Sequence, residues 1–338
     1  MSKNSHRSVP RKILIIETKD RHFTPAEKIP EEFLHLLLPF AGAYLERDAD
    51  CDILNQAIWL DGFSIWGHHV FVYKDILLAP FTPHHILALH FMLLANIEAD
   101  IDGKRRFSLQ QRQANLFSLH SRFHTAPLEA GQDIFSFHIN ITQEALHSLA
   151  LRYPELEHLA KKPISLNSGP LNRLPYDINP LSFDIIKAMY SCRLIEDQAK
   201  HFLQRCCLDL FTIFSIQDEY LENVSSAVPV TEKECEALDQ ALEYLSIHLP
   251  PPSRKKYLAE KWGFDENDFD IKFRQHFHLT FEKFLVLKKM MGAYELIVST
   301  SHSLSYVAWK TGFRNRQELI SRFESYYGCD IIAIRNAQ

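Results

Sequence analysis

Hydrophobic residues follow one period in the first part of the chain and another in the rest. From Asp52 to Ile141, aromatic and β-branched residues alternate with polar ones in short runs, and pairs such as Asp61-Gly62 separate the runs. A period of two is typical of strands with one buried face, and the glycine pairs are typical of tight turns. We therefore predict a small antiparallel β-domain over this stretch.

Helical spacing begins after Thr142, which is placed to cap a helix that carries Leu146 and Leu149. Beyond a proline-rich stretch, residues 181–190 and 194–221 carry apolar residues three and four positions apart. In the second range these are Phe202, Leu203, Cys206, Leu210, Ile213 and Phe214. Two helices are predicted here, and the second is long.

The periodicity is lost at residues 223–231, where small residues and a proline gather. We interpret this stretch as a linker between a domain formed by residues 1–222 and a C-terminal domain formed by residues 232–338. The predicted fold class is α+β, with an antiparallel β-domain and its helices followed by an all-α domain.

Two stretches of the C-terminal third share one pattern. In each, a pair ending in alanine stands four residues before a glycine, and three apolar residues follow at intervals of four. The two sets are Leu258, Ala259, Gly263, Phe269, Phe273 and Phe277, and then Val307, Ala308, Gly312, Leu319, Phe323 and Tyr327. Alanine lets two helices cross closely, and glycine tolerates the positive φ of a tight turn. Each stretch therefore predicts a helix-turn-helix unit.

Asp265 and Asn315 are placed to cap the second helix of each unit. Residues 281–298 between the units predict a connecting helix about 27 Å long. A rod of this length can hold two helices near the ~34 Å that separates successive major-groove faces of DNA. The alternative is a helical bundle that has no nucleic-acid role.

Charge and cysteine content limit the functional classes to which this protein can belong. The net charge is −5, yet from residue 250 onward 14 Lys and Arg stand against 10 Asp and Glu. This permits DNA binding at the C-terminal end, although solvated surfaces alone could produce the same split. The six cysteines show no CxxC spacing, and the amino terminus is polar. We expect a cytoplasmic protein with no disulfide framework, zinc site or membrane insertion.

The run from Leu258 to Gly328 resembles the DNA-binding domain of AraC/XylS-type transcriptional regulators, and the resemblance covers roughly residues 237–335. The positions in register include Ala293, Leu296 and Ile297 of the connecting helix, as well as both glycine turns. The resemblance implies seven helices with two helix-turn-helix units, whose second helices enter adjacent major grooves of double-stranded DNA. The resemblance also allows RNA polymerase as a further partner.

The resemblance also assigns residues that face DNA. In the second unit these are Arg314, Arg316, Gln317, Ile320 and Ser321, and in the first unit they are Asn267, Ile271, Lys272 and Arg274. Arginine can read guanine and glutamine can read adenine, each with roughly 1–3 kcal/mol of discrimination. Lys288 and Lys289 of the connecting helix are expected to face phosphate or solvent.

The first unit departs from the family pattern. Four acidic residues, Asp265, Glu266, Asp268 and Asp270, load its second helix with negative charge, which repels phosphate. His278 stands where the family usually has a glycine, and Glu324 of the second unit stands where a lysine is common. We predict that the first unit positions the protein and that the second unit reads bases.

The layout of residues 1–222 is similar to regulators in which a cupin-type β-barrel senses a small molecule and adjoining helices dimerise. It implies an unidentified small-molecule effector and a homodimer formed through residues 194–221, although that helix could equally pack within its own chain. Aromatic residues are the candidates for lining a ligand pocket, although half of them would be plain core. They are Trp59, Trp66, Phe91, Phe117 and Phe137.

Two other functions stay open. Eight of the 18 histidines lie between His68 and His138, which would suit a metal-binding cupin enzyme. The usual cupin spacing of histidines is absent, so we predict no metal site, cofactor or catalytic residue. The acidic first unit would also suit an adaptor that has kept the regulator fold and lost DNA binding.

Overall fold

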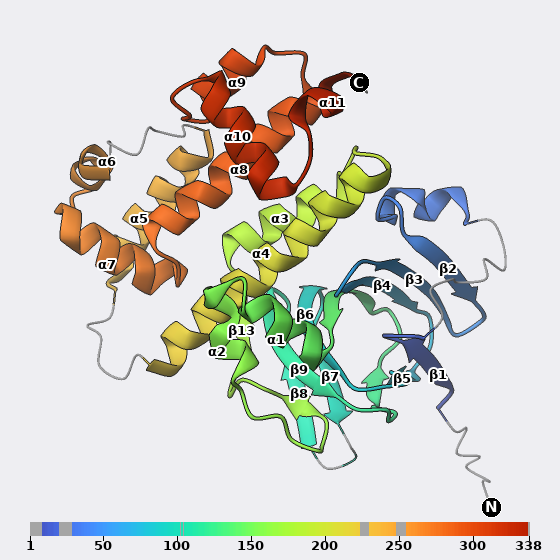
Figure 1. The fold of residues 1–338 in the computed structure, drawn as a ribbon. Coiled ribbons are helices and arrows are strands. Elements are labelled where there is room, and N and C mark those ends of the chain that lie inside the picture. The colour runs from blue at the N-terminus through green and yellow to red at the C-terminus, as the bar shows by residue number, and fades with distance from the viewer. Residues whose placement is uncertain are drawn as a thin grey trace, which may run out of the picture. The chain divides into compact units, whose positions relative to one another are not determined.

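The computed structural model describes residues 9–19, 29–101, 103, 105–223, 230–247 and 255–336. The chain forms two compact units, residues 1–178 and 179–338. The first is built on strands that are antiparallel except for one parallel pair, residues 11–15 with 77–81, and the second is helical (Figure 1). The predicted α+β fold class is confirmed.

The boundary between the two compact units, after residue 178, comes before the predicted helices at 181–190 and 194–221. The predicted linker at 223–231 comes after them. Residues 224–229 of that linker lie outside the described residues. Residues 181–221 therefore pack with the C-terminal helices rather than forming part of the N-terminal compact unit. The division of function at residues 1–222 and 232–338 stays a prediction.

Thirteen described strands form the N-terminal unit. They are β1 (Arg11–Ile15), β2 (Gly42–Arg47), β3 (Cys51–Trp59), β4 (Ser64–Val72), β5 (Ile76–Phe81), β6 (Ile86–Leu94), β7 (Ile97–Ile101), β8 (Arg105–Leu109), β9 (Gln113–Leu119), β10 (Ala126–Leu128), β11 (Asp133–Ile141), β12 (Gly169–Pro170) and β13 (Tyr176–Asp177). Its short helices are η1 (Glu31–Leu36), α1 (Gln143–Ala150), η2 (Pro154–Leu156) and α2 (Glu157–Ala160).

The large sheet has the order β12-β9-β6-β11-β4-β3-β2, with β13 also paired to β9, and all of its pairs are antiparallel. A smaller sheet, β1-β5-β10, and the β7-β8 pair complete the strands. Side chains from all three sheets share one apolar core, which includes Leu14, Val70 and Leu109. The predicted cap of α1 is confirmed, because the Thr142 side chain accepts a hydrogen bond from the Ala145 amide.

Nine described helices form the C-terminal unit. They are α3 (Pro180–Tyr190), α4 (Glu196–Asn223), α5 (Glu232–Ile247), α6 (Lys255–Lys261), α7 (Glu266–Phe277), α8 (Phe281–Ser299), α9 (Leu304–Lys310), α10 (Arg316–Tyr327) and α11 (Ile331–Asn336). The predicted helices at 181–190, 194–221 and 281–298 are α3, α4 and α8. The seven helices that the resemblance implied are α5 to α11.

Helix α8 connects the two helix-turn-helix units, α6–α7 and α9–α10 (Figure 1). No described helix has the length and apolar content needed to cross a bilayer.

Helix α4 differs from the expectation of a dimerisation helix. Its predicted apolar set is buried within the single chain, and no member exposes more than 4% of its surface. Helix α3 packs beside it, and α10 contacts it. Of the two arrangements that the sequence allowed for this helix, the structure has packing within its own chain.

Candidate nucleic-acid interface and ligand cavity

The turns of the two helix-turn-helix units have the backbone that the sequence predicted. Ala259 and Ala308 are fully buried where the paired helices cross. Gly263 has φ of +82° and Gly312 has φ of +76°, values that residues with a side chain rarely adopt. The sharp turns at these glycines fold each second helix back onto its first helix.

The second helices are capped as predicted, although by different chemistry. The Asp265 carboxylate accepts hydrogen bonds from the amides of Asn267 and Asp268, both at 2.9 Å. The Asn315 side chain accepts from the Glu318 amide at 2.9 Å. Glu318 in turn reaches back to accept from the Arg314 amide at 2.8 Å. These bonds satisfy amides that the first turn of a helix leaves unpaired.

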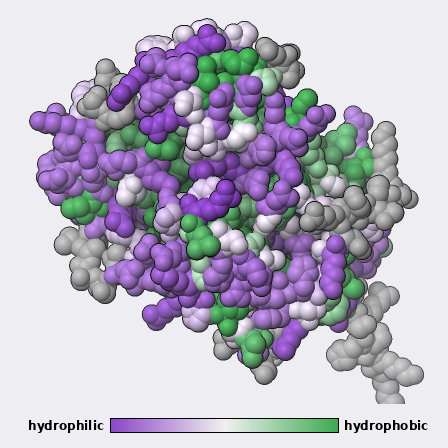
Figure 2. Space-filling model, viewed as in Figure 1, coloured by the Kyte–Doolittle hydropathy of each residue, from purple (hydrophilic) through white to green (hydrophobic). Residues whose placement is uncertain are grey.

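The predicted apolar stripes face inward in both units. Phe269, Phe273 and Phe277 of α7 are buried, and so are Leu319, Phe323 and Tyr327 of α10. Each stripe leaves the opposite face of its helix for solvent. Figure 2 shows that the face in view is mostly hydrophilic over the C-terminal helices, with hydrophobic side chains in small separate patches.

The amino-terminal end of α10 presents the residues that the sequence assigned to DNA. Arg314, Arg316, Gln317 and Ser321 are exposed, and Ile320 is half-buried. Among the described residues, neither Arg314 nor Arg316 forms an ion pair. A helix amino terminus carries partial positive charge, so two unpaired guanidinium groups beside it make this end attractive to phosphate and to guanine acceptors.

The predicted residues of α7 are arranged less favourably for DNA. Asn267, Ile271 and Arg274 are exposed and share one face. Lys272 forms an ion pair at 3.3 Å with Glu234 of α5, and the Arg274 guanidinium lies 5.4 Å from the centroid of the Tyr220 ring of α4. Both cations therefore have partners inside the chain.

Lys255, next to α7, is surrounded by acidic side chains. Its ammonium lies 2.6 Å from the Asp270 carboxylate, 3.6 Å from that of Glu282 and 3.7 Å from that of Glu266. The hydrogen bond to Asp270 raises the pKa of Lys255, so Lys255 stays protonated. Its positive charge is compensated by the neighbouring carboxylates. The first unit therefore presents little free positive charge toward a phosphate backbone.

Lys288 and Lys289 do not face phosphate or solvent as the sequence suggested. Lys288 binds the Asp184 carboxylate of α3 at 2.6 Å. Lys289 is buried and donates to the Gly312 carbonyl at 2.9 Å, which ties α8 to the turn of the second unit. Burial lowers the pKa of Lys289. Both lysines organise the helical unit because their partners lie on neighbouring elements.

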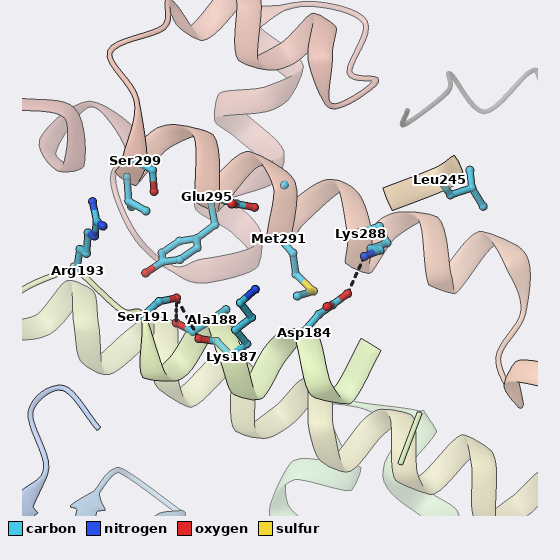
Figure 3. Close-up of a pocket in the computed structure, with 13 residues that line it drawn as sticks. Asp184, Lys187, Ala188, Ser191, Arg193, Leu245, Lys288, Met291, Glu295 and Ser299 are labelled. Carbon is cyan, nitrogen blue, oxygen red and sulfur yellow. Dashed lines mark hydrogen bonds and ion pairs between the residues drawn. The ribbon is translucent and has the colours of Figure 1, made fainter. Parts of the chain in front are cut away.

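A groove of about 370 Å³ lies between α3 and α8, and sequence reasoning did not find it. The Lys288–Asp184 pair lies in it, and Lys187, Arg193 and Glu295 line it as well (Figure 3). Gly292 of α8 also lines it, and a glycine within a helical apolar pattern was the one local signal of a hollow. Apart from Lys288, none of the residues predicted to face DNA or to bind an effector lines this groove.

A smaller cavity of about 90 Å³ lies inside the N-terminal unit. Apolar side chains from seven strands line it, together with polar side chains from His68, His90, His124 and Ser136. Of the five aromatic residues predicted to line a pocket, only Phe117 is at its wall.

The other four aromatic residues lie away from the cavity wall, and strand alternation explains two of them. Phe91 and Phe137 are directly paired on β6 and β11, next to His90 and Ser136, so they point to the opposite face of the sheet. Trp66 is fully buried on the inward face and stacks on His138. Trp59 packs against Trp66 at 5.8 Å between ring centroids.

The buried histidines of this unit form a hydrogen-bonded cluster. His68 and His138 meet through their Nε2 atoms at 2.9 Å, and their Nδ1 atoms lie beside the side-chain oxygens of Asn55 and Asn140. Burial lowers the pKa of His138 to about 4 and that of His90 to about 3, so both are neutral at pH 7. The cluster is therefore an uncharged polar wall beside the cavity.

No protein-family model matches the chain, and no curated protein matches it. Among solved structures, the DNA-binding domain of AdpA in complex with a target DNA is 24% identical over 30% of this chain and 91% of that chain, with a TM-score of 0.28. The C-terminal domain of the two-component response regulator yesN from Fusobacterium nucleatum is 23% identical over 30% of this chain and 95% of that chain, with a TM-score of 0.26.

ToxT from Vibrio cholerae covers more of the sequence, at 11% identity over 81% of this chain and 98% of that chain, with a TM-score of 0.31.

Proposed function

We propose that this chain is a DNA-binding transcription regulator of the AraC/XylS type, which reads the major groove mainly through α10. Arg314 and Arg316 carry the proposal, because they are exposed at the amino-terminal end of α10 and form no ion pair with any described residue. Behind them, Leu319 and Phe323 are buried, so the helix has one face for the protein and one for a partner. A guanidinium on such a face can bind guanine through two hydrogen bonds.

Helix α7 has a supporting role in this proposal. Its exposed face carries Asn267 and Ile271, the latter with 55% of its surface exposed, but its cations Lys272 and Arg274 are engaged within the chain. Asparagine can bind adenine, and an exposed isoleucine can contact a thymine methyl group. The first unit would therefore add positional contacts with little electrostatic attraction.

The N-terminal unit is proposed to sense a small molecule in the cavity beside His90. An apolar cavity of 150 Å³ holds benzene, so the smaller cavity in this unit fits only a smaller, mostly apolar molecule unless side chains move. His90 Nε2 is buried and has no hydrogen-bond partner among the residues that the structure describes, and a polar group of the effector could satisfy it. The N-terminal unit is thus proposed to be a cupin-like sensor domain.

The regulator is proposed to act in the cytoplasm as a homodimer. The apolar stripe of α4 does not support a dimer interface, because it is buried within the chain. Contact with RNA polymerase also belongs to this proposal, and no surface of the chain is assigned to it.

The direct test is selection of binding sites from random double-stranded DNA with the full-length protein, followed by mobility shifts at two salt concentrations. We expect one sequence motif to be enriched, with binding that weakens as salt rises because the protein displaces counterions from phosphates. Equal binding to selected and random DNA would contradict base reading by α10.

An adaptor without DNA binding is the second candidate. One observation favours it: the acidic residues of α7 hold Lys255, so the first unit is close to electrically neutral. Absence of any shift at low salt, with and without candidate effectors, would support the adaptor over the regulator.

A further inference from the structure

Helix α10 is joined to α4 by a buried ionic cluster, Arg205–Asp209–Tyr326. The Arg205 guanidinium binds one oxygen of the Asp209 carboxylate at 2.6 Å. The Tyr326 hydroxyl of α10 donates to the other oxygen, also at 2.6 Å. The same guanidinium lies 3.7 Å from the centroid of the Tyr326 ring. Both carboxylate oxygens of Asp209 are therefore engaged, one within α4 and one by α10.

The cost of burying these charges suggests a role beyond stability. Asp209 exposes only 5% of its surface. Removing a carboxylate and a guanidinium from water is expensive, and apolar residues of similar size often give equal or greater stability. Buried ionic groups are best attested as devices that fix the register of packed helices. In this cluster the fixed element is the helix that carries Arg316 and Gln317.

The rest of the same α4 face also holds α10. Residues 198, 202, 205 and 209 lie on one side of α4 because they are three and four positions apart. The Gln198 carbonyl accepts from the Cys329 thiol just beyond α10, and the Phe202 ring lies 5.5 Å from that of Tyr327. With Lys289 holding the Gly312 carbonyl at the other end, α10 is anchored near both of its ends.

The first unit has the same device on a different helix. With the caps Asp265 and Asn315 aligned, the position of Tyr326 in α10 corresponds to His276 in α7. The His276 ring binds the carboxylate of Asp239 on α5 at 2.8 Å. Each second helix is thus tethered, at the same position, to an aspartate on a preceding helix. The tether of α7 is exposed, whereas that of α10 is buried.

We propose that Arg205 and Asp209 are positioning residues for α10. Helix α4 would then hold the second helix of the second unit, as α5 holds the second helix of the first unit. The DNA-reading part of the chain would then include α4 and would not begin at residue 232. The consequence for DNA rests on the proposed function, but the positioning of α10 does not. A shift of α4 along its axis would move the carboxylate and, with it, the groove-facing side chains of α10.

Tyr326→Phe in the full-length protein is the sharpest test, because it removes one hydroxyl and leaves the ring beneath Arg205. We expect faster hydrogen exchange of the α10 backbone amides, with unchanged circular dichroism. We also expect the ratio of affinities for selected and random DNA to fall by about fivefold or more, the lower range of coupling between linked sites. Binding to random DNA should stay the same, which a general loss of structure would not allow.

Asp239→Asn is the matched control, because it weakens the exposed tether of the first unit, and exposed pairs contribute little. It should leave the exchange of α10 amides and DNA selectivity unchanged. If Tyr326→Phe leaves α10 exchange at the wild-type rate, the positioning role is wrong, whatever the DNA result. If the wild type selects no sequence, the proposed function fails, and α10 exchange in Tyr326→Phe still decides whether the cluster positions the helix.

Discussion

The two helix-turn-helix units share a backbone design and differ in how they use their charges. Each crosses its helices at a buried alanine, turns at a glycine with positive φ and buries three residues at intervals of four. Arg316 begins α10 with no ion-pair partner among the described residues, whereas its counterpart Glu266 begins α7 beside Lys255. The difference shows that a helix-turn-helix backbone alone does not make a basic surface.

The ends of the second helices differ in the same way. Both helices end in the left-handed region, at His278 with φ of +54° and at Gly328 with φ of +66°. Glycine adopts this conformation without steric cost, and histidine does not. His278 contacts α4 instead, because its ring lies 5.6 Å from that of Tyr220 and its Nδ1 lies 3.4 Å from the Gln217 amide nitrogen. The first unit therefore has no glycine at this helix end, and the side-chain contacts of His278 with α4 accompany the less favourable backbone conformation.

The largest expected effect tests whether the two cores are equivalent. Phe273 and Phe323 occupy matching positions, and both are fully buried. Phe273→Ala and Phe323→Ala should each lower the free energy of unfolding by about 3–5 kcal/mol, because each leaves a cavity the size of a ring. Urea unfolding of the two full-length variants measures this. Losses that differ by more than about 2 kcal/mol would show that the cores are not equivalent.

An intermediate effect is expected at the surface, where the units differ. Arg316→Ala should weaken binding to a selected DNA site by roughly 1–3 kcal/mol and relax the choice of one base pair. The matched variant Glu266→Ala should leave binding unchanged or tighten it, because it removes a negative charge. Competition binding against random DNA separates the two outcomes. An equal loss at both positions would mean that the two helices read DNA alike.

The smallest expected effect concerns the helix ends. His278→Gly should raise the free energy of unfolding by about 1 kcal/mol, because the left-handed conformation costs residues with a side chain roughly 1–2 kcal/mol. Gly328→Ala should lower it by a similar amount. A methyl group at residue 328 would meet His201 at 3.8 Å, an ordinary contact, so strain of the backbone is the main cost. If His278→Gly is destabilising, its contacts with α4 outweigh the strain.

Local patterns in the sequence predicted most of the helices and several of their caps. The helix at 281–298 was found within one residue of α8, and the caps Thr142, Asp265 and Asn315 all accept the expected amides. These features depend on residues within about four positions of one another, so a single sequence contains what is needed to find them. The alternation of apolar and polar residues, which predicted the strands, also predicted the antiparallel arrangement of the large sheet.

The partners of charged and aromatic residues were not predictable in the same way. Lys289 was assigned to phosphate or solvent and instead donates to the Gly312 carbonyl in the turn of the second unit. Phe91 and Phe137 were grouped with Phe117, yet they lie on the other face of the sheet. Each outcome depends on the registers and crossings of elements far apart in the chain, and no local pattern encodes these.

The sequence by itself determined the α+β class, the two helix-turn-helix units and the residues on the outer face of α10. Hydrophobic periodicity, glycine turns and caps act over a few residues, and they fix which face of an element is buried. Tertiary structure decided which cations stay free and placed α4 behind α10 instead of leaving its stripe exposed. Ion pairs and helix contacts between distant segments form only once the chain has folded, and they set the charge that each surface presents.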